Sequence, residues 1–424
     1  MKEFNDKLIF SKYTKFLESE NEVIIINGKS GVWGVLDKDK FELVRECISN
    51  EIEPENYIFK IESESIKSEL NDIFEVLIDE EMIVNDNMEK ENIQIDNVEF
   101  KLTGRCNLNC IHCAADCDIN GKEILNTEDV KIILDKLINL DIKTLMLTGG
   151  EPLIRRDIIE ILKHIRSKFK GTLRMITNGT LINDDTAFEL RKYLTEISIS
   201  LDGYNEESTD FVRGKGVYTK IVQAIKSLKR VGFEKNEIVL TMTATSQNSA
   251  HIDDFMLLCQ KLEVEGGVRQ FVAEGRGSTN FNKIGMVSYP DLSFKNEDEL
   301  EELRGKLKCN IICKAGINKL TINEFGDMYP CLFLEKKEFK IGNILNEDLD
   351  VIFNSKEYKN FINQKIIKSI VDNEKNHKCK NCNVRYFCMN DCLGYNNIDY
   401  NNDIILKEKC THMKPILNKI LWDK

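Results

Sequence analysis

Strand-like and helical hydrophobic patterns alternate through the middle of the chain, across residues 96–305. Short apolar runs bounded by turn residues predict strands, and apolar residues at helical spacing predict the helices between them. We expect strands at 98–102, 144–148, 173–177, 196–201, 237–243 and 268–273. The helical patterns fall near 128–140, 157–168, 184–193, 218–231 and 251–262. Six βα repeats of this kind predict an α/β fold with a parallel sheet, in the form of a partial barrel.

Residues 1–92 follow a different pattern and predict a small separate module. The expected order is a strand at 23–26, the hairpin signal Asn27-Gly28, a returning strand at 32–36 and a helix at 38–49. A second helical stripe starts near Ser63, and the polar run 85–92 is typical of a linker. A hairpin followed by helices predicts a winged-helix-like domain. The module holds no cluster of catalytic residue types, so we expect it to bind a partner.

The pattern changes again after residue 305. Strand and helix alternation fades across 306–412 while cysteines become dense, and residues 413–424 predict a short closing helix. An irregular segment of this size buries little apolar surface, so we expect metal centres to hold it together.

Composition excludes several classes of protein. Hydrophobic residues make up 42% and charged residues 31% of the 424 residues, which excludes a disordered chain. No apolar run reaches membrane-spanning length, and the polar start of the chain lacks the apolar core of a signal peptide. These features predict a cytoplasmic protein that does not enter a membrane. A net charge of −12 argues against nucleic acid as a partner.

The first cysteine cluster directly follows the first strand of the predicted barrel. Cys106, Cys110 and Cys113 form the pattern C-x3-C-x2-C. Three thiolates on one loop can hold three corners of a [4Fe–4S] cluster and leave the fourth iron open, which indicates chemistry at that iron. Structural zinc stays an alternative, as does Cys117 as a fourth ligand, although we expect a helical turn after Cys113 to direct Cys117 away. His112 is expected to pack nearby. A disulfide framework fits a long chain without a signal peptide poorly.

The strand 144–148 runs into Gly149-Gly150-Glu151-Pro152. Paired glycines allow close approach to the backbone, and Glu151 can accept hydrogen bonds from an ammonium group. An ordinary turn with a surface glutamate is the plain alternative.

Together, the C-x3-C-x2-C loop and the GGEP segment closely resemble the radical S-adenosylmethionine (SAM) superfamily. The resemblance implies a partial (β/α)6 barrel in which the amino and carboxylate groups of SAM chelate the open iron. It also implies that Gly149, Gly150 and Glu151, with Pro152 completing the motif, help to hold the methionine ammonium. One electron from the cluster then cleaves SAM to a 5′-deoxyadenosyl radical.

Further residues follow later strands. Asn178 comes after the third strand, Ser200 and Asp202 close the fourth, and Arg213 lies soon after. In similar enzymes such positions contact the ribose and the methionine carboxylate, and the forked donors of an arginine suit a carboxylate. The alternatives are a simple turn at Asp202 and a solvated charge at Arg213.

The second cysteine cluster resembles the SPASM extension of radical SAM enzymes that act on peptides and proteins. Its pattern comprises Cys313, Gly326, Cys331, Cys379, Cys382, Cys388, Cys392 and Cys410. By analogy, one auxiliary [4Fe–4S] cluster takes Cys313, Cys331 and Cys392, and the other takes Cys379, Cys382, Cys388 and Cys410. Cys309 supplies an eighth thiol, and whether it closes the first auxiliary cluster stays open. The resemblance therefore implies three [4Fe–4S] clusters. A zinc ribbon would leave several of these cysteines unexplained, and Cys47 and Cys259 are expected to be core thiols.

With these motifs assigned, the N-terminal module resembles the RiPP recognition element, which binds the leader of a ribosomally made precursor peptide as an added strand. The combined resemblance implies a radical SAM peptide maturase, and the first product we expect is a thioether crosslink from a substrate cysteine to a carbon. A carbon–carbon crosslinking maturase and a sulfatase-maturing type of enzyme, which oxidises a Cys or Ser in a protein, are the alternatives. A non-catalytic electron-transfer or scaffold protein is a further one. The expected partners are a leader-bearing precursor peptide and a flavodoxin- or ferredoxin-type electron donor.

Overall fold

The computed structural model describes residues 7–86, 93–285, 296–307, 309, 313–362, 379–388 and 403–423. The chain divides into two compact units. The barrel unit comprises Gln94–Ser288 and Ala315–Asn360. The other unit comprises Met1–Ile93, Tyr289–Lys314 and Phe361–Lys424, and we call it the recognition unit after the partner binding that the sequence predicts for its N-terminal module. Each unit is described by itself below.

The barrel unit is built on a parallel sheet. Its first six strands are β6 Asn97–Lys101, β7 Thr144–Thr148, β8 Thr172–Thr177, β9 Glu196–Ser200, β10 Ile238–Ala244 and β11 Glu265–Gln270. They lie side by side in chain order, and every pairing among them is parallel. The structure therefore confirms the predicted α/β partial barrel.

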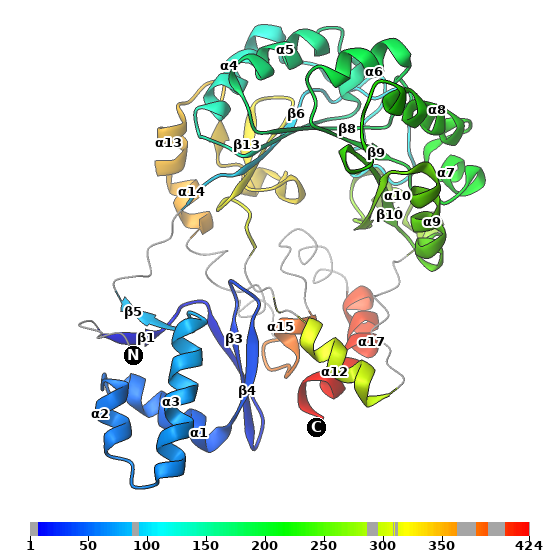
Figure 1. Ribbon diagram of the computed structural model, residues 1–424. Coiled ribbons are helices and arrows are strands. Elements are labelled where there is room, and N and C mark those ends of the chain that lie inside the picture. The colour runs from blue at the N-terminus through cyan, green and yellow to red at the C-terminus, as the bar shows by residue number, and fades with distance from the viewer. Residues whose placement is uncertain are drawn as a thin grey trace. The chain divides into compact units, whose positions relative to one another are not determined.

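Helices cover the outer face of this sheet (Figure 1). They are α4 Thr127–Ile138, α5 Ile158–Lys168, α6 Asp184–Arg191, α7 Glu206–Arg213, α8 Val217–Arg230 and α9 Ile252–Leu262. Alternate strand residues such as Leu145 and Leu147 are fully buried on this face. Their neighbours Met146 and Thr148, half-buried, point to the other face, because successive side chains of a strand alternate. Apart from α7, which carries Arg213, the sequence pattern predicts each of these helices.

The sheet extends beyond the predicted strands. β12 (Lys319–Ile322) pairs in parallel with β6, and β13 (Asp327–Tyr329) and β14 (Gly342–Asn343) follow antiparallel. The expectation that strand structure fades after residue 305 is therefore wrong for this stretch. The reason is length, because runs of two to four residues are too short to show a period. Two short helices, α13 (Leu349–Asn354) and α14 (Lys356–Phe361), complete it.

The N-terminal part of the recognition unit contains a three-stranded antiparallel sheet, a two-stranded pair and three helices. The elements are β1 Leu8–Phe10, β2 Thr14–Glu18, β3 Glu22–Asn27, β4 Trp33–Asp37, α1 Lys38–Ser49, α2 Pro54–Phe59, α3 Glu64–Asp79 and β5 Ile83–Asn85. The predicted hairpin and two helices are thus present, together with β1, β2, α2 and β5, which the pattern does not reveal. The likeness to a winged helix stays a prediction.

The central strand β3 is buried on both faces. Val23 and Ile25 pack with Phe41 of α1 and Phe74 of α3. Ile24 and Ile26, which point the opposite way, belong to a second core. That core explains why four isoleucines and valines follow one another without alternation.

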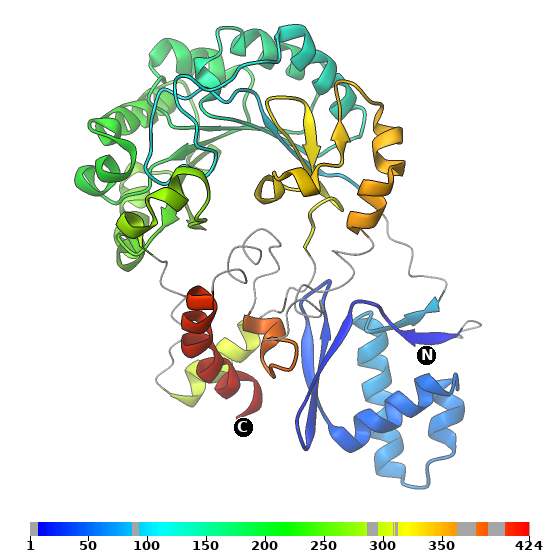
Figure 2. The ribbon, with the colours of Figure 1, turned by 180° about the vertical axis from the view of Figure 1, so that it is seen from behind.

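The second core joins the sheet to the C-terminal segments, which lie beside it in both views (Figures 1 and 2). These segments include α12 Glu297–Lys306, α15 Arg385–Cys388 and α17 Asp403–Trp422. Leu417 and Leu421 of α17 and Val384 pack against Ile24 and Ile26. The closing helix therefore begins at Asp403 rather than near residue 413. No helix in the part of the chain that the structure describes is long and apolar enough to cross a membrane.

Candidate active site

The three-cysteine loop leaves the carboxyl end of β6, where catalytic residues of such barrels gather. The Cys106 N–H donates to the Asp118 carbonyl at 2.7 Å, and the Ile111 N–H donates to the Val212 carbonyl at 3.0 Å. Cys106 is buried, whereas Cys110 and Cys113 are half-buried. The loop is thus fixed at both ends while two of its thiols stay partly accessible.

The GGEP turn packs directly on this loop. The Gly150 N–H donates to the Thr103 carbonyl at 2.7 Å, and the Glu151 N–H donates to the Arg105 carbonyl at 2.8 Å. A Cβ on Gly149 would stand 2.4 Å from the Thr103 carbonyl oxygen, and a Cβ on Gly150 would stand 2.2 Å from that of Arg105. Gly149 also has a φ of 143°, which L side chains rarely adopt. Both glycines are therefore required by the approach of the cysteine loop itself.

Glu151 is fully buried, so the alternative of a surface glutamate is wrong. Its carboxylate accepts hydrogen bonds from the Thr177 hydroxyl at 2.7 Å and from the Asn178 and Leu153 N–H groups at 2.7 and 3.1 Å. Burial raises the pKa of Glu151, and these donors oppose the rise. The side chain ties the GGEP turn to the end of β8.

Asn178 extends this connection to the first cysteine. Its side-chain amide donates to Asn107 Oδ1 at 2.9 Å and lies 3.9 Å from the Cys106 sulfur. The Leu108 N–H also points at that sulfur, at 3.5 Å. N–H groups aimed at a thiolate stabilise its negative charge.

Asp202 and Arg213 form a buried ion pair at 2.5 Å, so neither is a simple turn residue or a solvated charge. His112 Nε2 also lies 2.9 Å from the Asp202 carboxylate. Burial alone would raise the pKa of Asp202, but Arg213 and His112 outweigh it and hold that pKa well below its usual value. Arg213 Nη1 lies 4.0 Å from the Cys110 sulfur. Ser200 ends β9 and is half-buried.

Sequence reasoning missed Arg276, which anchors the cysteine loop from the far side of the barrel. Arg276 begins α10 (Gly275–Thr279), which follows β11. Its guanidinium donates to the carbonyls of Cys110 at 3.0 Å and Cys117 at 2.6 Å, and its N–H donates to the Cys113 carbonyl at 3.0 Å. The one available signal is its position after the last predicted strand.

The chain after Cys113 runs in turns, so the expected helix that would direct Cys117 away is absent from this described stretch. The buried Cys117 thiol instead forms a hydrogen bond with Cys113, which lowers the pKa of Cys113 to about 5. Cys117 therefore lies beside the loop's last cysteine.

These residues fit an iron–sulfur cluster. The three thiols lie near enough to influence one another electrostatically, with a cation beside Cys110 and amide donors beside Cys106. No three His, Cys, Asp or Glu side chains of the described residues stand ready for a single metal ion. In a cubane each thiolate binds a different iron, so the three sulfurs do not have to converge on one point.

The cysteines of the C-terminal pattern are distributed over both units. Cys331 is buried in the barrel unit, and Cys313 belongs to the recognition unit. Cys379, Cys382 and Cys388 lie in a turn and the short helix α15, which packs on α17, where Cys410 is exposed. Cys309 is buried in the second core of the recognition unit, and its thiol donates to the Tyr386 carbonyl at 2.8 Å. Cys392 lies outside the described residues. Cys47 and Cys259 are buried in cores, as predicted.

Comparison with known families accounts for both cysteine groups. Residues 100–259 match the radical SAM superfamily, and residues 313–383 match the iron–sulfur cluster-binding domain called SPASM. The chain carries a radical SAM domain and a SPASM domain. The radical SAM match contains all three loop cysteines, the GGEP turn, Asn178, Asp202 and Arg213.

Curated relatives of this chain include a maturase and a bacteriocin biosynthesis protein. Mycofactocin maturase MftC of Mycolicibacterium smegmatis is 29% identical over 265 residues, which is 58% of this chain and 67% of the relative. The subtilosin biosynthesis protein AlbA of Bacillus subtilis is 30% identical over 270 residues, covering 60% of this chain and 59% of AlbA.

Solved radical SAM structures share the fold at low identity. SuiB of Streptococcus suis, bound to S-adenosylmethionine, has a TM-score of 0.52 at 19% identity and covers 91% of this chain and 95% of SuiB. The protein anSMEcpe with bound AdoMet has a TM-score of 0.52 at 20% identity and covers 76% of this chain and 98% of that chain. The SuiB match leaves out 9% of this chain, which is about 38 of its 424 residues. The described part of the N-terminal module, residues 7–86, is longer than that. The similarity to SuiB therefore extends into the N-terminal module.

Proposed function

We propose that this protein is a peptide maturase that uses a SAM-derived radical to form a thioether crosslink in a ribosomally made precursor peptide. The observation that carries the proposal is the locked three-cysteine loop, with Arg213 beside Cys110 and Asn178 beside Cys106. Relatives named as a maturase and as a bacteriocin biosynthesis protein support a peptide substrate. SuiB, which shares the fold, has been solved with the precursor peptide SuiA bound, and this also supports a peptide substrate.

In this proposal Cys106, Cys110 and Cys113 hold a [4Fe–4S] cluster that binds SAM. When bound, the cluster supplies one electron that cleaves SAM to a 5′-deoxyadenosyl radical. The buried Glu151 side chain is engaged by three protein donors. We therefore assign the methionine ammonium to the backbone carbonyls of Gly149–Glu151, with Glu151 and Pro152 shaping that segment. Asn178, Ser200 and the Asp202–Arg213 pair are assigned to the ribose and methionine carboxylate, and Arg213 supplies positive charge there.

The SPASM cysteines are assigned to two auxiliary [4Fe–4S] clusters. Cys313, Cys331 and Cys392 hold the first, with Cys309 as a candidate fourth ligand. Cys379, Cys382, Cys388 and Cys410 hold the second. Thioether formation removes one hydrogen atom from the acceptor carbon, one proton from the cysteine thiol and one further electron. The deoxyadenosyl radical would take the hydrogen atom, and an auxiliary cluster, held by the SPASM cysteines, would be a suitable acceptor for the electron. A flavodoxin- or ferredoxin-type protein would supply the electron that starts each turnover.

We assign leader recognition to the N-terminal module, residues 1–92. The radical SAM domain is taken as residues 96–305 and the SPASM domain as 306–412, which then includes the first half of the closing helix α17 (Asp403–Trp422). The strand β4 has one partner, β3, among the described strands, so its other edge suits an added peptide strand. This edge argues against an enzyme of the sulfatase-maturing type, for which no leader-binding module is needed.

The test combines anaerobic reconstitution with coexpression. The wild-type protein should form 5′-deoxyadenosine, and the variant with Ala at Cys106, Cys110 and Cys113 should form none. Coexpression with a precursor peptide, sought first among short cysteine-rich reading frames beside this gene, should give a peptide that has lost two hydrogens per crosslink. Deoxyadenosine formation by the triple variant would overturn the mechanism.

Alkylation of thiols then separates the candidate products. A thioether consumes a cysteine thiol, so the modified residue should resist iodoacetamide. A carbon–carbon crosslink also removes two hydrogens but leaves every cysteine reactive. Oxidation of a Cys or Ser without a crosslink would favour the sulfatase-maturing type instead.

A further inference from the structure

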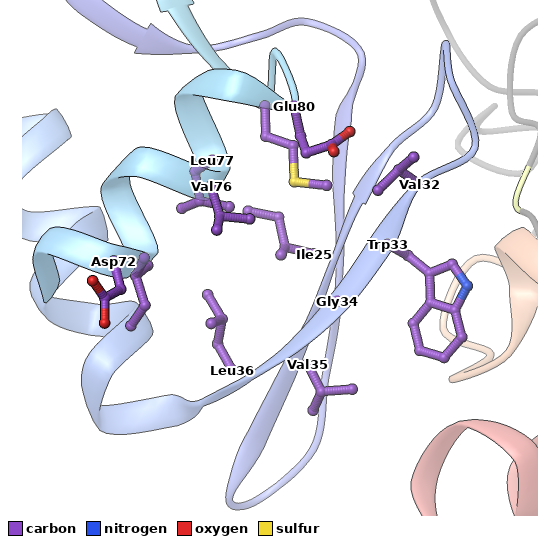
Figure 3. A pocket seen from close by; sticks show the side chains of 12 residues that line it. Ile25, Val32, Trp33, Gly34, Val35, Leu36, Asp72, Val76, Leu77 and Glu80 are labelled. Atoms are coloured by element: carbon purple, nitrogen blue, oxygen red, sulfur yellow. The ribbon is translucent and has the colours of Figure 1, made fainter. Parts of the chain in front are cut away.

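An apolar cavity of about 280 Å³ opens between β4 and α3 in the recognition unit (Figure 3). Val32 and Leu36 of the β4 hairpin line it on one side, and Ile73 and Val76 of α3 on the other. Gly34 lies between Val32 and Leu36 on the same face, and a Cβ at Gly34 would meet no atom within 4 Å. The missing side chain therefore creates the cavity, whose volume suits one or two aliphatic side chains.

The strand register shows which backbone groups an incoming chain would meet. The Asn27 N–H donates to the Val32 carbonyl at 2.9 Å, and the backbone N–H of Lys38 donates to the Asn21 carbonyl at 2.8 Å. Antiparallel pairs alternate, so Val32, Gly34 and Leu36 direct their backbone groups to β3. Trp33 and Val35 direct theirs to the open edge, next to the cavity.

One position of this edge already binds a segment of the same unit. The carbonyl of Gly31, which lies in the hairpin turn just before β4, accepts a hydrogen bond from the Cys309 N–H at 3.0 Å. The Trp33 indole donates to the Leu307 carbonyl at 2.7 Å. A segment of the same unit therefore lies beside the start of β4, and none of the described strands pairs with the open side of Trp33 and Val35.

The wall formed by α3 is strongly acidic. Between residues 64 and 81 the acidic residues are Glu64, Glu69, Asp72, Glu75, Asp79, Glu80 and Glu81, against the single base Lys67. Glu64, Glu69 and Glu81 have lysine partners. Asp72 and Glu80, which line the cavity, form no ion pair with any residue that the structure describes. Their charge favours a basic occupant.

We propose that this groove selects the leader by two features: an aliphatic side chain that fills the Gly34 cavity, and a lysine or arginine that faces Asp72 and Glu80. This inference rests on the proposed function, since it names the chemistry of the leader that the module binds. The leader pairs as an extended strand with Trp33 and Val35, and alternate side chains point into the groove.

Selection from a random peptide display library on the full-length protein tests this inference without a known leader. Enriched peptides should carry an aliphatic residue with Lys or Arg close by, and their affinity should fall as salt increases. Enrichment of acidic peptides, or no enrichment over a Gly34→Leu protein, would overturn it.

Matched variants locate the site, with anisotropy of the best labelled peptide as the measurement. Gly34→Leu fills the cavity and should weaken binding about tenfold or more, since an excluded aliphatic side chain is worth at least 1.4 kcal/mol. Asp72→Lys should weaken it about fivefold. Glu75→Lys, which makes the same charge change on α3 outside the cavity, should leave affinity within twofold. If Asp72→Lys and Glu75→Lys weaken binding equally, the preference for basic peptides comes from the overall negative charge of α3, and the proposed contact with Asp72 is wrong.

Deoxyadenosine formation without peptide separates this inference from the proposed function. The Gly34→Leu protein should cleave SAM as wild type does. If the protein selects basic peptides but cleaves no SAM, the groove inference stands and the proposed radical function is wrong. If the enzyme cleaves SAM but its peptide affinity does not change on substitution of Gly34 or Asp72, the proposed radical function stands and the groove inference is wrong.

Discussion

Glu151 shows how a single motif residue can support a site from the interior. Its carboxylate accepts three donors while fully buried. In Glu151→Gln, the amide NH₂ would face one of these donors and leave it unsatisfied. We expect the free energy of unfolding to fall by about 1–3 kcal/mol, measured by denaturant titration of the protein without clusters. Glu160→Gln, an exposed carboxylate on α5, is the control and should change stability by at most about 0.5 kcal/mol. Equal stability of the two variants would contradict this role.

Asp202 gives a pH-dependent prediction. Its folded pKa lies below the unfolded value of about 3.9, so its carboxylate stabilises the fold above that pH. The contribution disappears as the pH falls from about 4 toward the folded pKa. Asp202→Asn should lower stability by about 3–5 kcal/mol at pH 7, because Arg213 is left buried and unpaired. The difference from wild type should shrink below about pH 4 in thermal melts of the protein without clusters. Asp184→Asn, which breaks the exposed pair with Arg230, should show neither effect.

At this scale the sequence predicts which residues gather and misses how they interact. Strand-end position and spacing bring the three cysteines, Asn178, Asp202 and Arg213 together. No local pattern shows that Asp202 pairs with both Arg213 and His112, since that depends on side chains from two loops and from helix α7. Arg276 was missed for the same reason, because it acts across more than 150 residues of sequence, with its partner Cys117 at a separation of 159.

Strand β4 is the element on which the two halves of the recognition unit meet. Its Gly34 face lines the cavity with α3, and its Trp33 face contacts the C-terminal segments. The Trp33 ring lies edge-on to Phe387 with centroids 5.2 Å apart, next to Cys388. A peptide that pairs with β4 would therefore bind a strand that also supports the segment carrying SPASM cysteines.

Trp33→Phe tests this support. A smaller aromatic ring stays, while the hydrogen bond to the Leu307 carbonyl and part of the indole's packing are lost, so about 1–3 kcal/mol of local stability should disappear. We expect faster amide hydrogen exchange in residues 379–388 and around Leu307, with little change in α1 and α3. Unchanged exchange in 379–388 would show that the two segments are not coupled. Val35→Thr is the control on the same face of the same strand.

Elements long enough to show a repeating hydrophobic pattern were predictable, and short elements that depend on pairing with distant segments were not. The six barrel strands and α1 have enough residues for their patterns to be read. β12, β13 and β14 have two to four residues each and exist because β6 offers an edge. The unbroken apolar run of β3 becomes clear only when the C-terminal segments cover its second face.

On the scale of the whole molecule, the recognition unit combines the two ends of the chain. Leu17, Ile24 and Ile26 form one core with residues of α17 and with Cys309. The N-terminal module therefore supports the fold around Cys379, Cys382 and Cys388, in addition to the leader recognition that we propose for it. The barrel unit has its own core and contains every residue assigned to SAM.

Deleting residues 1–92 should separate these two roles. Removal of β2 and β3 exposes the apolar face of α17, so the turn that carries Cys379, Cys382 and Cys388 should lose its support. We expect reconstituted iron to fall from about twelve to about eight per chain, the loss of one cubane, while SAM cleavage in the barrel persists. The variant with Ala at Cys106, Cys110 and Cys113 should also lose about four irons but should lose SAM cleavage with them. A truncated protein that keeps all of its iron would show that the second core is dispensable. Because truncation removes more than a binding edge, loss of peptide modification in that protein would not by itself assign recognition to β4, and the Gly34→Leu variant is the sharper measurement.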